Sequence, residues 1–400
     1  MTHRPMPNDP MIRQLVAMAK KSKVTRRTFL AGSGGAAIAA GLAACSTGGS
    51  VEAAEDVSAT DKSLIWSNWP LYIDQDDDGT SPTLQRFIEQ SGITVTYNED
   101  YDDNNTYYAK VRDQLKLGQD IGADIVTPTE WMAARWGQLG YVQELNADNI
   151  PNKANVVDSL ANPDWDPGRM KSLPWQAGFA GLVYNTDATD EVRSVEDLWR
   201  PDLKGRVVVL SEMRDTMGLL LMANGVDISG DFSSDDFSAA IELLQTQVSS
   251  GQIANVKGNS YSEDLVNEDA LAGIVWSGDI IQLNFEAGYE KWKFVFPDSG
   301  ATIWNDTMVV PIGSSKKTNA EILMNYYYDP AVAAEVAAWV NYVTPVKGAY
   351  EEAVKIDPEL AENQLIFPND ETLSQVKAFK TLTSDEDNEF QAAFQSVLIG

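Results

Sequence analysis

Residues 63–97 read SLIWSNWPLYIDQDDDGTSPTLQRFIEQSGITVTY. Ser63–Trp66 and Ile93–Tyr97 are short runs rich in apolar, β-branched and aromatic residues, which is typical of strands. Between them, Ser81-Pro82 offers a helix N-cap followed by proline at the first helical position, and Gly92 is the residue type that commonly ends a helix. The stretch therefore predicts a strand, a helix and a second strand, the unit from which helix-covered parallel sheets are built.

The same alternation continues along most of the chain. A helix over residues 106–117 and a strand over residues 123–126 are predicted next, and helices dominate from residue 319 onward. This pattern predicts an α/β fold with a largely parallel sheet. The other predicted strands are residues 206–210, 272–276, 294–296 and 307–310, and the other predicted helices are residues 217–223, 235–248 and 280–286.

The N-terminal region resembles an export signal. Arg26-Arg27 is a twin-arginine pair, a mildly apolar Gly/Ala-rich stretch covers residues 31–44, and Leu42-Ala43-Ala44-Cys45 matches a lipoprotein-processing box. The apolar stretch is shorter than the ~20 residues that a transmembrane helix needs. Export followed by lipid attachment is therefore expected, rather than an uncleaved anchor.

This interpretation divides the start of the chain into a signal and a tether. Residues 1–44 would be removed, Cys45 would carry the lipid, and residues 45–61, which contain few large apolar side chains, would form a flexible tether. The mature protein would then lie on the outer face of the cytoplasmic membrane, anchored through Cys45.

The composition of the chain is strongly acidic. The whole sequence has a net charge of −29, and removing residues 1–44, with seven Lys or Arg and one Asp, leaves 23 basic and 58 acidic residues and a net charge of −35. This balance argues against nucleic-acid binding, which needs Lys and Arg for the phosphates. It gives slight support to a cationic ligand.

Two residue types are confined to the signal and its cleavage point. The single Cys is Cys45 and the single His is His3. The mature chain would therefore lack Ser-His-Asp and Cys-His catalysis, His-based zinc sites and disulfides, and we expect no cofactor, no metal and no enzyme activity. Carboxylate-only hydrolysis remains open.

Aromatic side chains gather where four predicted strands or their loops end, beside acidic or small residues. In open α/β sheets, ligands bind beyond the carboxyl ends of the strands. A Trp face attracts an ammonium group by ~0.5–2 kcal/mol, and a neighbouring carboxylate adds a charge-assisted hydrogen bond. Four such groups predict a box for an organic cation, although a single Trp is more often core filling. They are residues 67–72, 128–131, 276–279 and 303–306.

With these motifs in place, the chain resembles the spermidine/putrescine-binding lipoproteins of polyamine ABC importers over most of residues 62–400. Glu212 and Asp215, which on spacing alone we interpret as helix-capping acids, fall where that family places acids that hold an amine. The segments that carry the resemblance are residues 68–72, 92–95, 124–128, 197–205, 276–279, 304–306 and 342–345.

The resemblance implies a fold and a function. The fold is the type II periplasmic-binding-protein fold, with two α/β lobes that close on a ligand in the cleft between them. Lobe 1 is expected over residues 62–177 and 277–324, and lobe 2 over residues 178–276 and 325–400. The function is capture of a polyamine by a monomeric receptor that delivers it to an ABC permease and its ATPase.

The resemblance also implies thirteen ligand-binding residues of three kinds: aromatic walls, acids that bind ammonium groups, and hydroxyls at the polar edge. The aromatic residues are Trp69, Tyr72, Trp131, Tyr261, Trp276, Trp304 and Tyr342. The acids are Glu212, Asp215, Asp279 and Asp306, and the hydroxyl residues are Thr129 and Ser260.

Two departures from the family pattern leave the choice of ligand open. Pro70 and Leu71 stand where relatives often have Ser or Thr and an acid, and Glu130-Trp131 replaces a Thr-Tyr pairing. Other solutes therefore remain alternatives: a quaternary amine, an opine or an iron complex. A carboxylate-based hydrolase is a further alternative.

Overall fold

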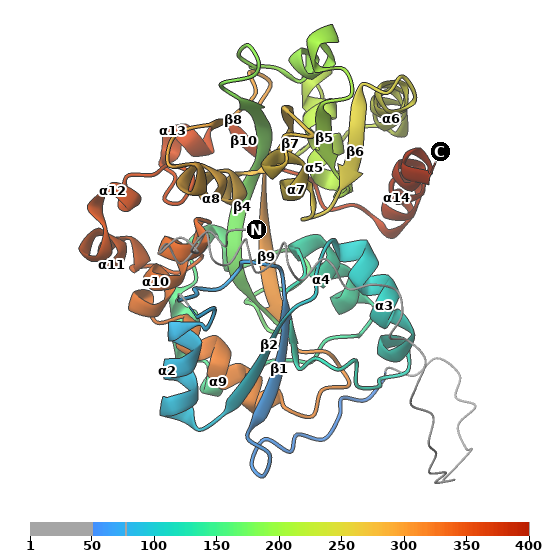
Figure 1. Ribbon diagram of the computed structural model, residues 1–400. Coiled ribbons are helices and arrows are strands. Elements are labelled where there is room, and N and C mark those ends of the chain that lie inside the picture. Colours follow the sequence, from blue (N-terminus) through green and yellow to red (C-terminus); the bar gives the residue numbers. More distant parts are fainter. Residues whose placement is uncertain (1–50, 77, 400) are drawn as a thin grey trace, which may run out of the picture.

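The computed structural model describes residues 51–399 apart from Asp77. The expected signal over residues 1–44 and the expected lipid site at Cys45 lie outside the described residues. Figure 1 shows two α/β lobes, one above the other, with strands β4 and β9 running through both. No helix in the described ranges has the length and apolar content needed to cross a membrane.

One sheet runs through both lobes, and its two outer parts are parallel. Its order is β2-β1-β3-β9-β4-β7-β5-β6, with β8 paired to β4 and β10 paired to β9. The first lobe holds β1 (Ser63–Asn68), β2 (Thr94–Glu99) and β3 (Ile125–Val126), and the second holds β5 (Val207–Leu210), β6 (Ile253–Lys257), β7 (Ala272–Trp276) and β8 (Trp292–Val295).

The two long central strands are β4 (Ser172–Asn185) and β9 (Ala301–Val309), and the short strand β10 (Val376–Ala378) pairs with β9 in parallel. β9 pairs with β3 and β4, and β4 pairs with β7 and β8, all antiparallel. The largely parallel sheet predicted from sequence is therefore wrong at its centre. The reason is that the chain crosses between lobes there, so neighbouring strands run in opposite directions.

The first β-α-β unit forms as its sequence predicts. The Ser81 hydroxyl accepts a hydrogen bond from the Leu84 amide at 3.1 Å, and Gly92 ends the helix with φ 70°. Leu84 and Phe87 are buried on the face of the helix that covers the sheet. β1 and β2 then pair in parallel from Ser63 opposite Thr94.

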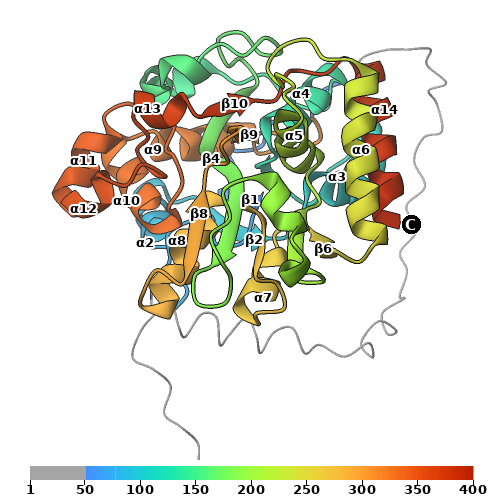
Figure 2. The same ribbon diagram turned by 90° about the horizontal axis from the view of Figure 1, so that it is seen from above.

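Helices cover both faces of the sheet, as Figures 1 and 2 show. Those around the first lobe are α2 (Pro82–Ser91), α3 (Asn104–Lys116), α4 (Glu130–Gln138), α9 (Lys317–Tyr327) and α10 (Pro330–Val340), followed by α11 (Ala349–Ile356) and α12 (Pro358–Ala361). Those of the second lobe are α5 (Met213–Ala223), α6 (Ser234–Ser249), α7 (Tyr261–Val266), α8 (Ser277–Ala287), α13 (Asp370–Leu373) and α14 (Ser384–Ile399). Short 3₁₀ helices span Ala147–Asn149, Pro151–Asn155, Asp158–Leu160, Val195–Trp199 and Pro201–Leu203.

Strand pairing and packing place some segments in a different lobe from the one expected. β8 pairs with Leu182–Asn185, the end of β4 that also pairs with β7 in the second lobe, and α8 packs beside β8. α10 packs on α2 and α9 in the first lobe. The boundaries expected at residues 277 and 325 differ from this arrangement because the chain returns to the first lobe only along β9 and stays there through α9 and α10.

The described part of the expected tether lies against the first lobe. The Ala54 amide donates to the Ile312 carbonyl at 3.0 Å, and the Val57 amide donates to the Ser315 carbonyl at 2.8 Å. Asp56 accepts hydrogen bonds from the amide and hydroxyl of Thr318. Residues 51–61 are thus fastened to the fold, so a free tether could only precede residue 51.

Candidate ligand-binding site

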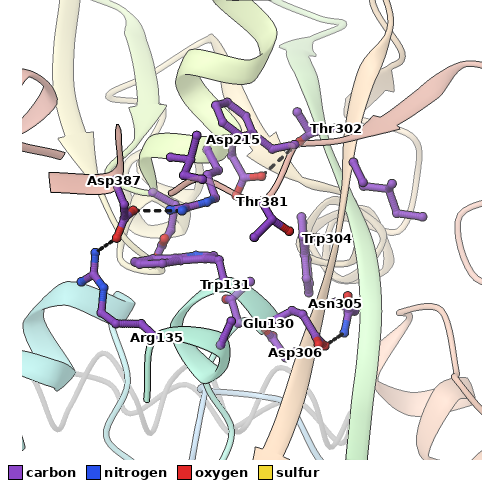
Figure 3. A pocket seen from close by; sticks show the side chains of 18 of the residues that line it. Glu130, Trp131, Arg135, Asp215, Thr302, Trp304, Asn305, Asp306, Thr381 and Asp387 are labelled. Carbon is purple, nitrogen blue, oxygen red and sulfur yellow. Dashed lines mark hydrogen bonds and ion pairs between the residues drawn. The ribbon is translucent and has the colours of Figure 1, made fainter. Parts of the chain in front are cut away.

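A cavity of about 630 Å³ lies between the two lobes. This volume lies within the range of ~300–1,000 Å³ typical of small-molecule sites. Figure 3 shows its wall, with side chains from both lobes pointing inward. The structure brings eleven of the thirteen predicted residues to this wall: Trp69, Tyr72, Thr129, Trp131, Glu212, Asp215, Trp276, Asp279, Trp304, Asp306 and Tyr342.

The other two predicted residues, Ser260 and Tyr261, stand behind the wall. The Tyr261 hydroxyl donates to Asp279 Oδ2 at 2.6 Å, so Tyr261 is buried and acts on the cavity through Asp279. The Ser260 amide donates to Asp102 Oδ1 at 3.1 Å, and Asn259 lines the cavity instead. The prediction that Ser260 and Tyr261 line the cavity is therefore wrong, because other residues stand between them and the cavity.

The aromatic residues form a connected set of rings around the cavity. The ring centres of Trp69 and Trp276 are 6.0 Å apart, and those of Trp276 and Trp304 are 6.3 Å apart, both edge to face. Tyr342 continues the set, 5.4 Å from Trp304 and 5.4 Å from Tyr72. Such rings present apolar faces to methylene groups and negative faces to ammonium groups.

Trp69 and Tyr72 owe their positions to a tight turn after β1. Leu71 has φ 56°, a left-handed conformation that is costly for a branched side chain. The Leu71 amide donates to Glu99 Oε1 at 3.0 Å, which helps to hold the turn, and Trp69 Nε1 donates to the Thr127 carbonyl at 2.9 Å. The strained turn thus directs two successive aromatic side chains toward one cavity.

Asp306 lies on β9 and is almost completely buried, with 3% of its surface exposed. Burial raises the pKa of its carboxyl to about 7. Its Oδ1, the Tyr72 hydroxyl and the nearby Trp304 Nε1 make no hydrogen bond of normal geometry among the described residues, although Tyr72 and Thr129 lie close enough to Asp306 to lower its pKa somewhat. Unpartnered buried polar atoms are rare, and here they lie at the wall of a cavity.

Asp279 begins helix α8 and accepts hydrogen bonds from two tyrosines. Tyr342 donates to Oδ1 at 2.9 Å and Tyr261 donates to Oδ2 at 2.6 Å. Burial nevertheless raises the pKa of Asp279. The carboxylate is held in one orientation, with its remaining lone pairs available to a donor in the cavity.

Gly278 makes room for this arrangement. A Cβ at Gly278 would meet the ring of Tyr342 at 2.5 Å, closer than any real contact, so the ring packs directly on the backbone. We expect Gly278→Ala to push the Tyr342 hydroxyl away from Asp279 and to lower the free energy of unfolding by about 1–3 kcal/mol. Chemical denaturation and ligand titration measure the two effects.

Gly230→Ala is the matched control for that substitution. A Cβ at Gly230 would meet its nearest neighbour at 3.8 Å, which is ordinary contact. Gly278→Ala protein with the stability of Gly230→Ala would show that the Tyr342 ring moves at no cost.

Asp215 and Glu212 lie at the start of α5. Asp215 accepts from Trp276 Nε1 at 2.9 Å and from the Thr302 hydroxyl at 3.1 Å, and burial raises its pKa to about 6. Glu212 Oε1 accepts from the amide and the side chain of Asn104, each at 2.8 Å. Burial, followed by the charge of Asp103, raises the pKa of Glu212 to about 8. Glu212 thus bridges the two lobes as well as lining the cavity.

Glu130 lines the cavity, but its carboxylate also binds several neighbouring side chains. Its carboxylate pairs with Arg169, whose side chain is only 2% exposed, at 2.8 and 2.9 Å. Asn305 and Thr307 donate to the same group at 2.5 and 3.0 Å. Sequence motifs could not reveal this role, because Arg169 is distant in the chain.

The C-terminal segment contributes a part of the cavity that no sequence motif indicated. Residues 378–382, Ser384, Asp387 and Asn388 line it, together with Arg135 and Arg214. Arg214 covers the Trp131 ring with its guanidinium carbon 4.2 Å from the ring centre. One face of Trp131, predicted as a ligand wall, is therefore occupied by another side chain.

Comparison with known proteins gives concordant results. The model of the bacterial extracellular solute-binding protein family matches residues 83–363. The spermidine/putrescine-binding periplasmic protein of Escherichia coli is 28% identical over 314 residues, which cover 78% of this chain and 84% of that protein. The putrescine-binding periplasmic protein PotF of Escherichia coli is 26% identical over 330 residues, covering 78% and 85% of the two chains.

Solved structures share the fold. The spermidine/putrescine substrate-binding protein PotD of Streptococcus pneumoniae superimposes with a TM-score of 0.67 and 24% identity, covering 84% of this chain and 98% of that one. The PotD lipoprotein of Treponema pallidum superimposes with a TM-score of 0.70 and 20% identity, covering 84% and 100%. The expected type II periplasmic-binding-protein fold is thereby confirmed.

Proposed function

Since this chain belongs to the bacterial extracellular solute-binding protein family, we propose that it captures a polyamine outside the cytoplasm and delivers it to an ABC importer. The proteins of this family bind solutes for transport and are not enzymes. The spermidine- and putrescine-binding relatives support a polyamine as the solute.

One observation carries the choice of ligand. Four carboxyl groups, those of Glu212, Asp215, Asp279 and Asp306, face the same cavity as the connected aromatic rings. Carboxylates brought together out of water repel one another, and a multivalent cation relieves that repulsion. Rings between the acids suit the methylene segments that separate the amino groups of a polyamine.

The mechanism is binding followed by lobe closure. Each ammonium group would replace its hydration shell with carboxylate oxygens, with Asp306 Oδ1 available for one of these contacts. The rings of Trp276, Trp304 and Tyr342 would cover the carbon chain. The contact of Glu212 with Asn104 links the lobes over the ligand, which excludes water and strengthens the charge contacts.

The location on the membrane is part of the same proposal. The family is extracytoplasmic, and the twin-arginine pair with the box ending at Cys45 supports export and lipid attachment. Because residues 51–61 are fastened to the first lobe, only residues 45–50 would separate the lipid from the fold. A monomer that docks on a permease, with its ATPase on the inner side, completes the proposal.

The test is a thermal-shift screen of the chain from residue 51 onward, followed by calorimetry. The panel contains putrescine, spermidine, spermine, choline, amino acids, opines and sugars. A ligand at 100 times its dissociation constant stabilises by about 2.7 kcal/mol, so a polyamine-selective rise in melting temperature is expected. A rise in melting temperature with only another solute would reject a polyamine as the ligand. No rise with any compound would reject the receptor function.

A further inference from the structure

Four side chains close one wall of the cavity from three different helices. We call Trp131 and Arg135 of α4, Arg214 of α5 and Asp387 of α14 the clasp. Asp387 Oδ1 accepts from Arg214 Nη2 at 2.9 Å, and Asp387 Oδ2 pairs with Arg135. The guanidinium carbons of Arg214 and Arg135 lie 4.2 and 5.2 Å from the Trp131 ring centre. Figure 3 shows Asp387 above Trp131 and Arg135, with a dashed line joining Asp387 to Arg135.

The clasp joins the two lobes. Helix α4 packs on β9 in the first lobe, whereas α5 packs on β5 and α14 packs on α6 in the second. The Arg135–Asp387 pair therefore crosses the cleft, and the Arg214–Asp387 pair lies within the second lobe. One turn further along α14, Gln391 Oε1 accepts from Asn105 Nδ2 of α3 at 3.1 Å. The first half of α14 is thus fastened to the first lobe at two points.

The clasp is shielded from solvent. The side chains of Arg214 and Asp387 are each 13% exposed, and that of Arg135 is 21% exposed. Burial raises the pKa of Asp387, but the charges and hydrogen bonds of Arg214 and Arg135 outweigh it, and the net result is a lowered pKa. The acid is therefore ionised at neutral pH. A pair this shielded is screened far less than an exposed surface pair, whose worth is about 0–1 kcal/mol.

We propose that Arg135 and Asp387 are positioning residues that lock the closed lobes and set how long the ligand stays bound. The inference rests on the proposed function. Opening the hinge moves α4 away from α14, so the Arg135–Asp387 contact must break before a ligand can leave. Arg214 holds Trp131 in place as a wall of the cavity in the meantime. The clasp then acts on dissociation and leaves the encounter with the ligand unchanged.

The test is Arg135→Met, which removes the contact across the cleft and keeps the Arg214–Asp387 pair. Stopped-flow tryptophan fluorescence with spermidine measures both rate constants. We expect the dissociation rate to rise about tenfold, equivalent to about 1.4 kcal/mol, and the association rate to stay within about twofold. Arg112→Met, on α3 with a side chain that is 61% exposed, is the charge-matched control for this variant. Asp385→Asn, in the same turn of α14 as Asp387 but exposed, is the control for Asp387→Asn, and both controls should bind as wild type.

A double mutant tests whether Arg135 and Asp387 act through their mutual contact or through separate structural roles. Arg135→Met with Asp387→Asn should raise the dissociation rate by much less than the product of the single effects, because both substitutions remove the same Arg135–Asp387 contact, while only Asp387→Asn also removes the pair with Arg214. If the two residues only stabilised the fold, the substitutions would lower the melting temperature without changing the dissociation rate more than the association rate. An unchanged dissociation rate in Arg135→Met, or equal effects in Asp385→Asn, would overturn the clasp.

Failure of the proposed function gives a different result. If wild-type protein did not bind spermidine, the polyamine proposal would fall, and the clasp would be tested by small-angle X-ray scattering alone. Arg135→Met is then expected to have a larger radius of gyration than wild type and than Asp385→Asn. Equal radii would overturn the clasp independently of any ligand.

Discussion

Asp306→Asn is expected to abolish most of the polyamine affinity while leaving the ligand-free protein at least as stable as wild type. Asp306 is buried on the crossing strand β9, and its Oδ1 accepts no hydrogen bond of normal geometry from the residues that the structure describes. An amide there cannot compensate an ammonium charge. Removing one partner of a buried charge pair costs about 2–5 kcal/mol, or roughly 30- to several-thousand-fold in the dissociation constant. Calorimetry with spermidine at pH 8 measures the loss.

The stability of ligand-free Asp306→Asn protein distinguishes a direct loss of ligand binding from misfolding. Because burial raises the pKa of Asp306 to about 7, ionising it in the empty cavity is unfavourable, and the neutral amide removes that cost. Asp113→Asn removes the same charge from a side chain that is 88% exposed on α3, and controls for long-range attraction of the ligand. Asp306→Asn protein that binds within about threefold of Asp113→Asn, a difference of ~0.7 kcal/mol, would show that Asp306 does not hold an ammonium group.

Except for the edge strand β6, the strands in the outer parts of the sheet were predicted from sequence because their signals are local. Ser81 and Pro82 mark the start of α2 and Gly92 marks its end, each at the helix end itself, and β7 has the predicted bounds, Ala272–Trp276. The acids and rings of the cavity follow strand ends, where an open sheet brings separate loops together. Local residue patterns were therefore enough to place most of the cavity wall.

Strand β4 was not predicted because its residue types fit a strand only in contact with the segments that pack against it. It contains Pro174, Gln176 and two glycines, and it is buried along nearly its whole length, so it lacks the alternation of a half-exposed strand. A Cβ at Gly181 would meet the Phe294 ring at 2.6 Å, and one at Gly178 would meet Trp304 and Tyr342 at 2.7 Å. These glycines allow close packing against segments more than a hundred residues away.

The clasp was missed for a related reason. Asp387 lies in the run Ser384–Glu389, which reads as the solvated acidic start of a helix, and such acids commonly serve the helix dipole. Its partner Arg135 precedes it by 252 residues. Only the docking of α14 against α4 shows that one acid of this run faces two arginines.

The ligand-free protein is expected to lose stability as the pH rises from about 5 to 8.5. Burial raises the pKa of Asp215 to about 6, of Asp306 to about 7 and of Glu212 to about 8. An acid with a raised pKa in the folded state stabilises that state fully below its unfolded pKa of ~4, and the contribution is lost as the pH rises through the folded value. Each group can contribute up to about 1.4 kcal/mol per pH unit. Acids with lowered pKa values, such as Asp227 and Glu386 at about 2, do not titrate in this window.

Polyamine affinity is expected to change with pH in the opposite direction. The ammonium groups, whose pKa values resemble the ~10.4 of lysine, stay charged while the acids of the cavity ionise, so binding releases protons and tightens by up to about tenfold per pH unit for each proton released. Calorimetry at pH 6.5 in two buffers of different ionisation enthalpy counts those protons. Spermidine binding with no proton release, together with a melting temperature of the ligand-free protein that is flat from pH 5 to 8.5, would mean that these carboxyl groups are already ionised before the ligand arrives.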